Sequence, residues 1–219
     1  MIKLSLSARL GPALLASLAI SGVLGGCVAV VGGAVAGGTM MAVDRRSTGA
    51  QVDDQTIELR ASNAVTAAIG ERGNVSATSY NRVVLLTGQV PNEADRAKVE
   101  AAVAKVENVR TVVNELAVLP NSDLTQKSTD TLTTTKVKAA FVEARQLQTA
   151  SIKVVTERGV VYLMGRVTEA EANTAANVTR SIGGVQKVVK VFEIITAAEL
   201  AAMPIPPTTA APPASAAKP

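Results

Sequence analysis

The stretch VVLLTGQV at residues 83–90 returns with the same pattern as VVYLMGRV at residues 160–167. A second pair, VRTVV at 109–113 and VQKVV at 185–189, follows them at a nearly constant distance. Repeats at a near-fixed offset indicate two copies of one structural unit. Copies of about 70 residues favour two small paired domains over a solenoid.

Each copy is expected to fold in the order helix, strand, strand, helix, strand. In the first copy, Asp53 or Asp54 can cap a helix that runs to about Gly70, because apolar residues recur there at helical spacing. The first copy then continues with strands over 74–79 and 83–88, a helix from the stretch 91–93 and a strand over 109–119. The second copy has a helix from about Asp130, strands over 151–156 and 160–165, a helix over 169–182 and a strand over 185–195. The predicted fold class is therefore α+β: two tandem α-β-β-α-β domains, each a three-stranded sheet with two helices on one face.

The central strands carry apolar side chains on both faces. In the second copy Leu163 points to one face, and Tyr162 and Met164 point to the other. A large apolar face marks an interface, and packing of the two domains against each other is preferred here to an external partner. The two central glycines, Gly88 and Gly165, are expected to permit a bulge or a tight strand exit.

The N-terminal segment has the layout of a secretory signal peptide. It carries Lys3 and Arg9, no acid, and then an apolar run over 10–24. The run ends in LGGC at 24–27, which resembles a bacterial lipobox and implies lipid attachment to the Cys27 thiol with cleavage before it. The alternative is an uncleaved membrane anchor with an incidental cysteine.

These features divide the chain into six segments: a lipoprotein signal peptide (1–26), the acylated cysteine with a glycine-rich tether (27–50), a first domain (51–119), a linker (120–128), a second domain (129–196) and a tail (197–219). Glycine disfavours a helix over 28–43, although an interfacial helix is the competing interpretation. The tail is rich in alanine and proline and is expected to be disordered.

Composition excludes several classes of function. The chain has no histidine, and Cys27 is its only cysteine, so zinc sites of Cys/His type, an intrachain disulfide and His-dependent nucleophiles are excluded. No clustered carboxylate pair is present, and we expect no catalytic residue, no metal and no cofactor. Loss of Lys3 and Arg9 reduces 22 basic residues to 20, against 18 acidic ones. No basic cluster interleaved with aromatics occurs, so nucleic acid is not an expected partner.

The element order, with a Gly-Val pair at 184–185 before the last strand, resembles the BON domain. Two such domains behind a lipobox resemble the division- and outer-membrane-stress-associated lipoprotein family, as do the strings DRRS (44–47), QVDD (51–54), TTKV (134–137) and GRVTE (165–169). The resemblance implies a non-enzymatic lipoprotein on the periplasmic side of the outer membrane, which supports envelope integrity and localises to the division site. Val28, where aspartate would signal inner-membrane retention, implies outer-membrane sorting.

The same resemblance implies that the second domain binds anionic phospholipids such as phosphatidylglycerol. Val137 and Phe141 are expected to carry most of the packing of its first helix, while Leu132 lies off that face beside Lys136. Members of the family carry tryptophan where this chain has Leu132, and tryptophan is the better interfacial anchor. The candidate lipid-binding residues are Leu132, Thr135, Lys136, Lys138 and Arg145.

Two alternatives stay open. The lysines can form a solvated helix face, with Leu132 as a hydrophobic staple at the helix start. The protein can also be an adaptor for envelope or division proteins, in cell-wall amidase activation or outer-membrane protein assembly. Such an adaptor would use an exposed sheet face or the proline-rich tail.

Overall fold

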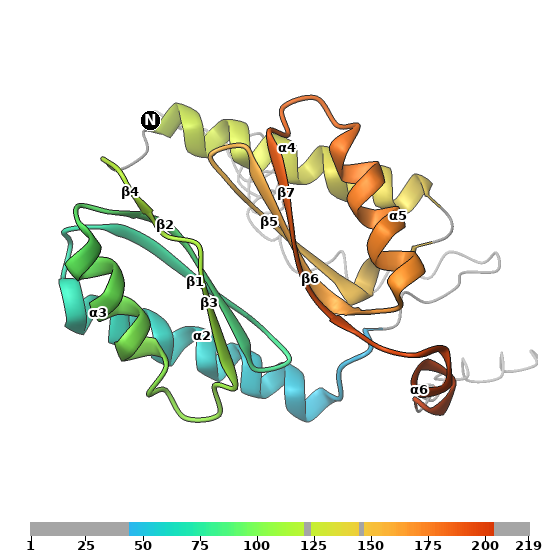
Figure 1. Cartoon of the computed structure of the whole chain (residues 1–219), viewed down its shortest axis with the longest axis horizontal. Helices are drawn as coiled ribbons and strands as arrows, with labels where there is room; N and C mark the ends of the chain where they lie inside the picture. Colours follow the sequence, from blue (N-terminus) through green and yellow to red (C-terminus); the bar gives the residue numbers. More distant parts are fainter. Residues whose placement is uncertain (1–43, 121–123, 145–146, 204–219) are drawn as a thin grey trace, which may run out of the picture. The chain divides into compact units, whose positions relative to one another are not determined.

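The computed structural model describes residues 44–120, 124–144 and 147–203. These residues contain two copies of the predicted unit, which we call the first repeat (44–120) and the second repeat (124–196) (Figure 1). The predicted signal peptide, Cys27, Arg145 and most of the predicted tail lie outside the described residues.

The first repeat forms one sheet with two helices. Its elements are α2 (Thr48–Ile69), β1 (Asn74–Tyr80), β2 (Val83–Val90), α3 (Glu93–Val103), β3 (Thr111–Asn114) and β4 (Ala117–Val118). Strand β1 pairs antiparallel with β2, and β3 and β4 each pair parallel with β2. The predicted third strand over 109–119 is divided into β3 and β4, and at the division the Asn114 side chain accepts a hydrogen bond from the Leu116 N–H (3.1 Å).

The second repeat has the same order of elements. They are α4 (Leu124–Glu143), the 3-10 turn η2 (Thr149–Ser151), β5 (Ile152–Glu157), β6 (Val160–Val167), α5 (Glu169–Arg180) and β7 (Lys187–Ile194). Strand β5 is antiparallel to β6, and β7 is parallel to it. The predicted α+β class and the duplicated α-β-β-α-β order are confirmed.

Three helices begin where the sequence did not predict them. Helix α2 starts inside the predicted tether, because the Ser47 hydroxyl accepts a hydrogen bond from the Ala50 N–H (3.1 Å) and caps the helix. Helix α4 starts inside the predicted linker, where hydroxyl groups bond to carbonyls of the helix itself. A short helix, α6 (Ala197–Ala202), occupies the start of the predicted disordered tail and begins with a capping box made by Thr196 and Glu199.

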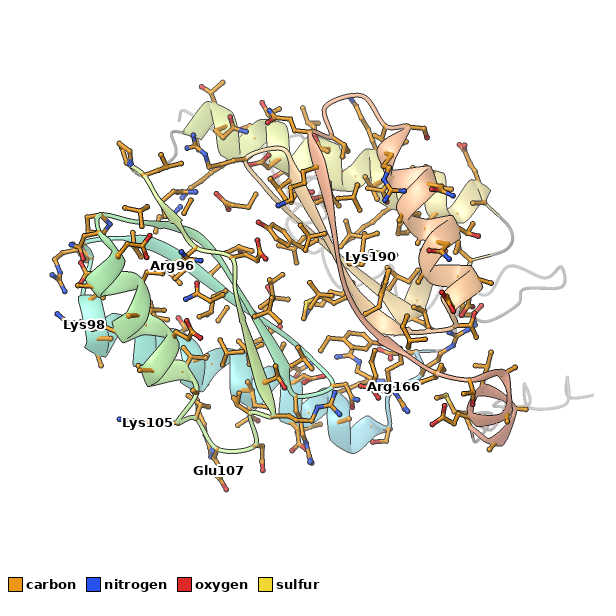
Figure 2. The ribbon with its side chains drawn as sticks, in the orientation of Figure 1. Arg96, Lys98, Lys105, Glu107, Arg166 and Lys190 are labelled. Carbon is orange, nitrogen blue, oxygen red and sulfur yellow. The ribbon has the colours of Figure 1, made fainter. Side chains whose placement is uncertain are left out.

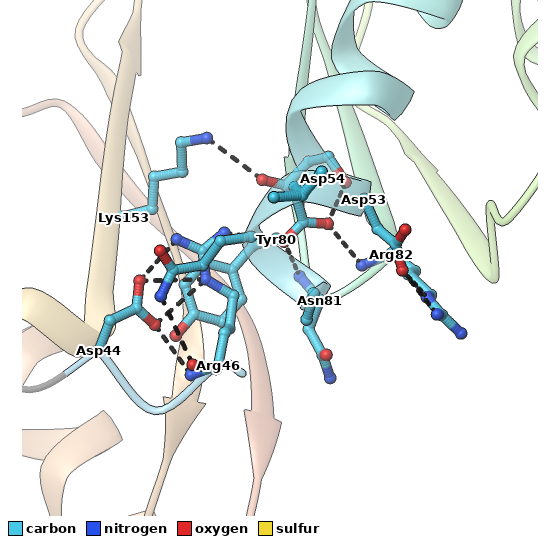
Figure 3. A network of polar contacts seen from close by, with 12 residues as sticks. Asp44, Arg46, Asp53, Asp54, Tyr80, Asn81, Arg82 and Lys153 are labelled. Atoms are coloured by element: carbon cyan, nitrogen blue, oxygen red, sulfur yellow. Dashed lines mark hydrogen bonds and ion pairs between the residues drawn. The ribbon is translucent and has the colours of Figure 1, made fainter. Parts of the chain in front are cut away.

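Neither Asp53 nor Asp54 caps α2, although the sequence predicted that one of them would: both lie inside the helix, and Asp54 is buried. Asp54 is 2 % exposed, and its carboxylate accepts hydrogen bonds from the Ser79 hydroxyl (2.7 Å), the Asn81 N–H (2.7 Å) and the Arg82 N–H (2.8 Å) (Figure 3). Asn81 and Arg82 have φ angles of 50° and 66°, which are unfavourable for residues with a side chain. The buried carboxylate therefore holds the turn between β1 and β2 in an otherwise costly conformation.

Asp130 has the same role in the second repeat. Its carboxylate accepts hydrogen bonds from the Arg158 N–H (2.7 Å) and the Gly159 N–H (2.9 Å) of the β5–β6 turn. Arg158 again has a positive φ angle, of 51°. A tie from the first helix to the hairpin turn is thus common to both repeats.

The two sheets bury their open faces against each other. Each repeat has its own core between sheet and helices, and a third cluster joins Tyr80 and Leu85 of the first repeat to Tyr162 and Met164 of the second. All four side chains of this cluster are buried. The predicted packing of one domain on the other is confirmed, and the alternation in the central strands explains it.

Polar contacts surround this apolar cluster. The Tyr80 hydroxyl donates to the Ser151 carbonyl (3.1 Å), and the Lys153 ammonium lies 2.6 Å from the Glu58 carboxylate. Glu193, on β7, accepts hydrogen bonds from Arg110 and Asn81 of the first repeat and from Arg166, which is labelled in Figure 2. The interface between the repeats therefore has an apolar centre and a charged rim, as protein interfaces do.

Gly88 and Gly165 do not make a bulge or a strand exit. The strand register runs through both without interruption, with Gly88 opposite Val75 and Gly165 opposite Ile152. A Cβ atom at Gly88 would lie 1.9 Å from the Asn74 carbonyl oxygen, and one at Gly165 would lie 2.4 Å from the Ser151 carbonyl oxygen. Glycine is needed because the neighbouring strand approaches too closely for a side chain.

Replacing Asp54 with alanine should cost about 3–5 kcal/mol of unfolding free energy, because Arg46 and two turn amides lose a buried charged partner. Urea denaturation followed by circular dichroism measures this loss. The neighbouring Asp53→Ala is the matched control: among the described residues Asp53 pairs with Arg82 alone, at the surface, so the expected loss is below about 1 kcal/mol. Equal losses in the two variants would contradict the assigned role of Asp54.

Asp54 should also give the protein a characteristic acid sensitivity. Burial opposes ionisation, but hydrogen bonds from Arg82, Ser79, Arg46 and Asn81 outweigh it and hold the pKa of Asp54 below its ordinary value. Its stabilising contribution is complete above the unfolded-state pKa of about 3.9 and is lost as the pH falls through the lower folded-state pKa. We expect the unfolding free energy of Asp54→Asn to fall less steeply with pH below about 4 than that of the wild type. Urea titrations across this range measure the slope, and parallel slopes would refute the prediction.

Candidate functional site on helix α4

Helix α4 packs on the second repeat through one face only. Thr133, Val137 and Phe141 are buried, as their spacing predicts, and Asp130 is buried beside them. Ala140 and Ala144, which the sequence placed on the same face, are partly buried. The opposite face is solvent-exposed.

The exposed face of α4 carries a row of apolar side chains, which we call the outer stripe. Leu132 is 62 % exposed, Val142 is 68 % exposed, and Leu124 in the first turn is 80 % exposed. Thr135 and Ala139 are exposed between Leu132 and Val142, on the same side of the helix. The sequence reasoning found Leu132 and Thr135 but missed Leu124 and Val142, although helical spacing from Leu132 would have located Val142.

Several threonines of α4 donate their hydroxyl protons to carbonyls of the helix itself, whereas Thr134 donates to Thr156 of β5. The hydroxyls of Thr131 and Thr135 donate to the carbonyls of Lys127 and Thr131, at 2.9 and 3.0 Å, and those of Ser128, Thr129 and Thr133 bond in the same way. A hydroxyl that donates its proton to its own helix needs no acceptor from water, and only its lone pairs remain to be hydrated. The exposed face is therefore less polar than its composition suggests.

Lysines flank the outer stripe. Lys136 and Lys138 are exposed, and neither makes an ion pair within the described part of the chain. Lys127 is exposed near the start of α4, with its ammonium 3.3 Å from the Asn74 side-chain oxygen. Since Asp130 is buried, Glu143 is the single exposed acid of α4. The exposed face thus carries apolar side chains at intervals among serine and threonine, with lysines at its sides.

The corresponding helix of the first repeat lacks this combination. Helix α2 also exposes apolar residues, Val52 and Leu59. Its exposed or partly exposed charged residues, however, are held in ion pairs: Asp53 with Arg82, Glu58 with Lys153 and Arg60 with Glu107. Acidic residues outnumber basic ones within α2, whereas basic residues outnumber acidic ones within α4.

Helix α3 also lacks the combination of exposed apolar side chains and basic side chains without an ion pair in the described residues. Figure 2 shows Arg96 and Lys98 on this helix, and Arg96 pairs with Glu93 while Lys98 lies 3.9 Å from Asp95. None of the exposed large apolar residues of the described chain lies on α3. Of these three helices, α4 is the one on which exposed apolar side chains coincide with lysines that have no ion-pair partner in the described part of the chain.

The described residues offer no group of three or more acidic, histidine or cysteine side chains that could hold a metal ion. No helix among them is both long enough and apolar enough to span a membrane. Helix α4 has the side chains of a helix that can lie at the interface between water and an apolar phase whose surface is negatively charged. Of the predicted site residues, Leu132, Thr135, Lys136 and Lys138 lie together on this helix, while Cys27 and Arg145 lie outside the described residues.

Comparison with known families supports the duplicated fold. The family model described as the BON domain matches residues 53–120 and again 129–196. The chain therefore belongs to the BON domain family, and its two repeats are two BON domains.

Two relatives extend the comparison to whole proteins. The chain is 44 % identical over 176 residues to the outer membrane lipoprotein DolP of Haemophilus influenzae, covering 78 % of this chain and 90 % of DolP. It is 34 % identical over 155 residues to a 21 kDa hemolysin of Actinobacillus pleuropneumoniae, covering 70 % of this chain and 80 % of that protein. The likeness to DolP identifies an outer-membrane lipoprotein with two BON domains, as the sequence predicted.

Among solved structures, the C-terminal domain of CdsD, a structural protein of the type III secretion system of Chlamydia trachomatis, aligns with a TM-score of 0.27. The alignment has 12 % sequence identity and covers 61 % of this chain and 96 % of that domain.

Proposed function

We propose that the protein is held on the periplasmic side of the outer membrane by lipid at Cys27, and that helix α4 binds anionic phospholipid such as phosphatidylglycerol. The observation that carries this proposal is the outer stripe. Exposed Leu132 and Val142 lie on the same helix as Lys136 and Lys138, which have no ion-pair partner among the described residues. The protein acts by binding, without catalysis.

The strength of such a contact can be estimated. Each lysine near an anionic bilayer contributes about 1 kcal/mol, and Leu132 contributes about 1.5–3 kcal/mol if it becomes fully buried. The sum of roughly 4 kcal/mol corresponds to a dissociation constant of about 1 mM. This is too weak to recruit a free protein. It is sufficient for one already tethered to the same membrane, because a tether supplies a high effective concentration.

In this proposal the lipid tether and helix α4 have different roles. Lipid at Cys27 keeps the protein at the membrane, and α4 distinguishes regions rich in anionic lipid from the rest. Support for envelope integrity and localisation at the division site follow as proposals from membership in this lipoprotein family.

One of the two surfaces that an adaptor would use is buried. An open sheet face is not available to a partner, because Leu85 of the first domain and Tyr162 and Met164 of the second are buried between the sheets. The proline-rich tail, its other surface, lies outside the described residues. Binding to anionic lipid is therefore the function that the described surface supports best.

Vesicle flotation tests the proposal. Protein spanning residues 44–203, which lacks the tether, should float with vesicles that contain phosphatidylglycerol and not with vesicles of phosphatidylcholine alone. Leu132→Glu should reduce flotation at least about tenfold, because it removes apolar area and adds a repelled charge. Raising the salt concentration from 0.1 to 0.5 M should weaken binding, because screening acts on exposed charges.

Leu59→Glu is the matched control, because Leu59 is 65 % exposed on the equivalent helix of the first domain. This variant should float like the wild type. Absence of flotation with phosphatidylglycerol, or an equal loss in both variants, would exclude α4 as the lipid-binding surface.

A further inference from the structure

Two consecutive arginines just before α2 bind to different domains. The Arg45 guanidinium makes two hydrogen bonds to the Glu171 carboxylate (2.6 and 2.8 Å) and a third to the Arg166 carbonyl (2.9 Å). Glu171 and Arg166 both belong to the second domain. The side chains of Arg45 and Glu171 are only 10 % and 16 % exposed, so this is a sheltered, two-pronged ion pair.

Arg46 binds to the first domain. Its guanidinium lies 2.8 Å from the Asp54 carboxylate and 4.3 Å from the centre of the Tyr80 ring, over which it stacks (Figure 3). Asp44 holds the same guanidinium from the other side at 2.7 Å. Ser47 then caps α2, so the polypeptide is fixed at both ends of this short segment.

The residues that Arg45 and Arg46 contact are already structural elements of their domains. Glu171 forms the capping box of α5 with Thr168, and Asp54 ties the β1–β2 turn to α2. Tyr80 belongs to the apolar cluster between the sheets, and its hydroxyl donates to the Ser151 carbonyl of the second domain. The segment is therefore bonded to rigid parts of both domains, beside their interface.

We propose that residues 44–47 act as a clasp that holds the two BON domains in one fixed arrangement, with Arg45 bound to the second domain and Arg46 bound to the first. The segment connects directly to residues 27–43, the predicted tether. The arrangement of the domains then depends on residues that precede the first domain in the sequence, in addition to the sheet-to-sheet contact. This inference does not depend on lipid binding by α4.

Electron–electron distance measurements between two spin labels test the clasp in the full chain. Cys27 is the only native cysteine, so a Cys27→Ser background leaves two introduced cysteines as the sites of labelling. Exposed Ala67 on α2 and exposed Asn177 on α5 place one label on each domain. We expect one narrow distance distribution in this background, and a distribution about twice as wide after Arg45→Ala and Arg46→Ala are added together.

Two further variants separate the clasp from general destabilisation. Arg60→Ala removes an ion pair made inside the first domain, with Glu107, and should leave the distribution unchanged. Glu171→Gln keeps a side chain suited to the capping box but removes the charge that Arg45 binds, and it should widen the distribution while circular dichroism stays that of the wild type. A distribution in the double arginine variant or in Glu171→Gln as narrow as that of Arg60→Ala would overturn the proposal.

Discussion

A carboxylate buried between the first helix and the hairpin turn organises each BON domain. Asp54 in the first domain and Asp130 in the second accept the amide hydrogens of turns whose residues have positive φ angles. Such turns are costly for residues other than glycine, and the buried charge needs these donors as much as the turn needs the acceptor. The helix, the turn and both strands of the hairpin therefore adopt their positions together.

The hairpin fixed in this way determines how the two domains meet. Every second residue of β2 and β6 points into the core of its own domain. The residues between them, such as Leu85 and Tyr162, form the shared cluster between the sheets. Covering both sheets leaves the helices as the outer surfaces of the pair. The two first helices then differ in charge pairing, and α4 alone among α2, α3 and α4 joins exposed apolar residues to lysines without an ion-pair partner among the described residues.

Local patterns predicted much of this arrangement. The repeated stretch at 83–90 and 160–167 was sufficient for the two domains, the central strands and their apolar faces, because strand alternation is a short-range property. Asp54 was misassigned as a helix cap, since an aspartate near a helix start is ordinarily a cap and its partners at 79–82 are distant in sequence. The contact of Arg45 could not be predicted for the same reason, because Glu171 lies in the other domain. The ionic partners of Arg46, by contrast, are the nearby Asp44 and Asp54. Leu124 was not predicted, because the start of α4 falls in a polar segment without a strong helix signal, whereas helical spacing from Leu132 was sufficient to locate Val142.

The hydroxyl groups of α4 that donate to its own carbonyls affect the free energy of transferring such a helix from water into a lipid headgroup layer. A side chain that depends on water for its hydrogen bonds must be stripped of that water when it enters a lipid headgroup layer, and the stripping costs free energy. Thr131 and Thr135 carry their acceptors with them as carbonyls of the same helix. If α4 binds lipid as proposed, it would meet the bilayer already folded, and its threonines would lose fewer hydrogen bonds to water than threonines whose hydroxyls donate to water.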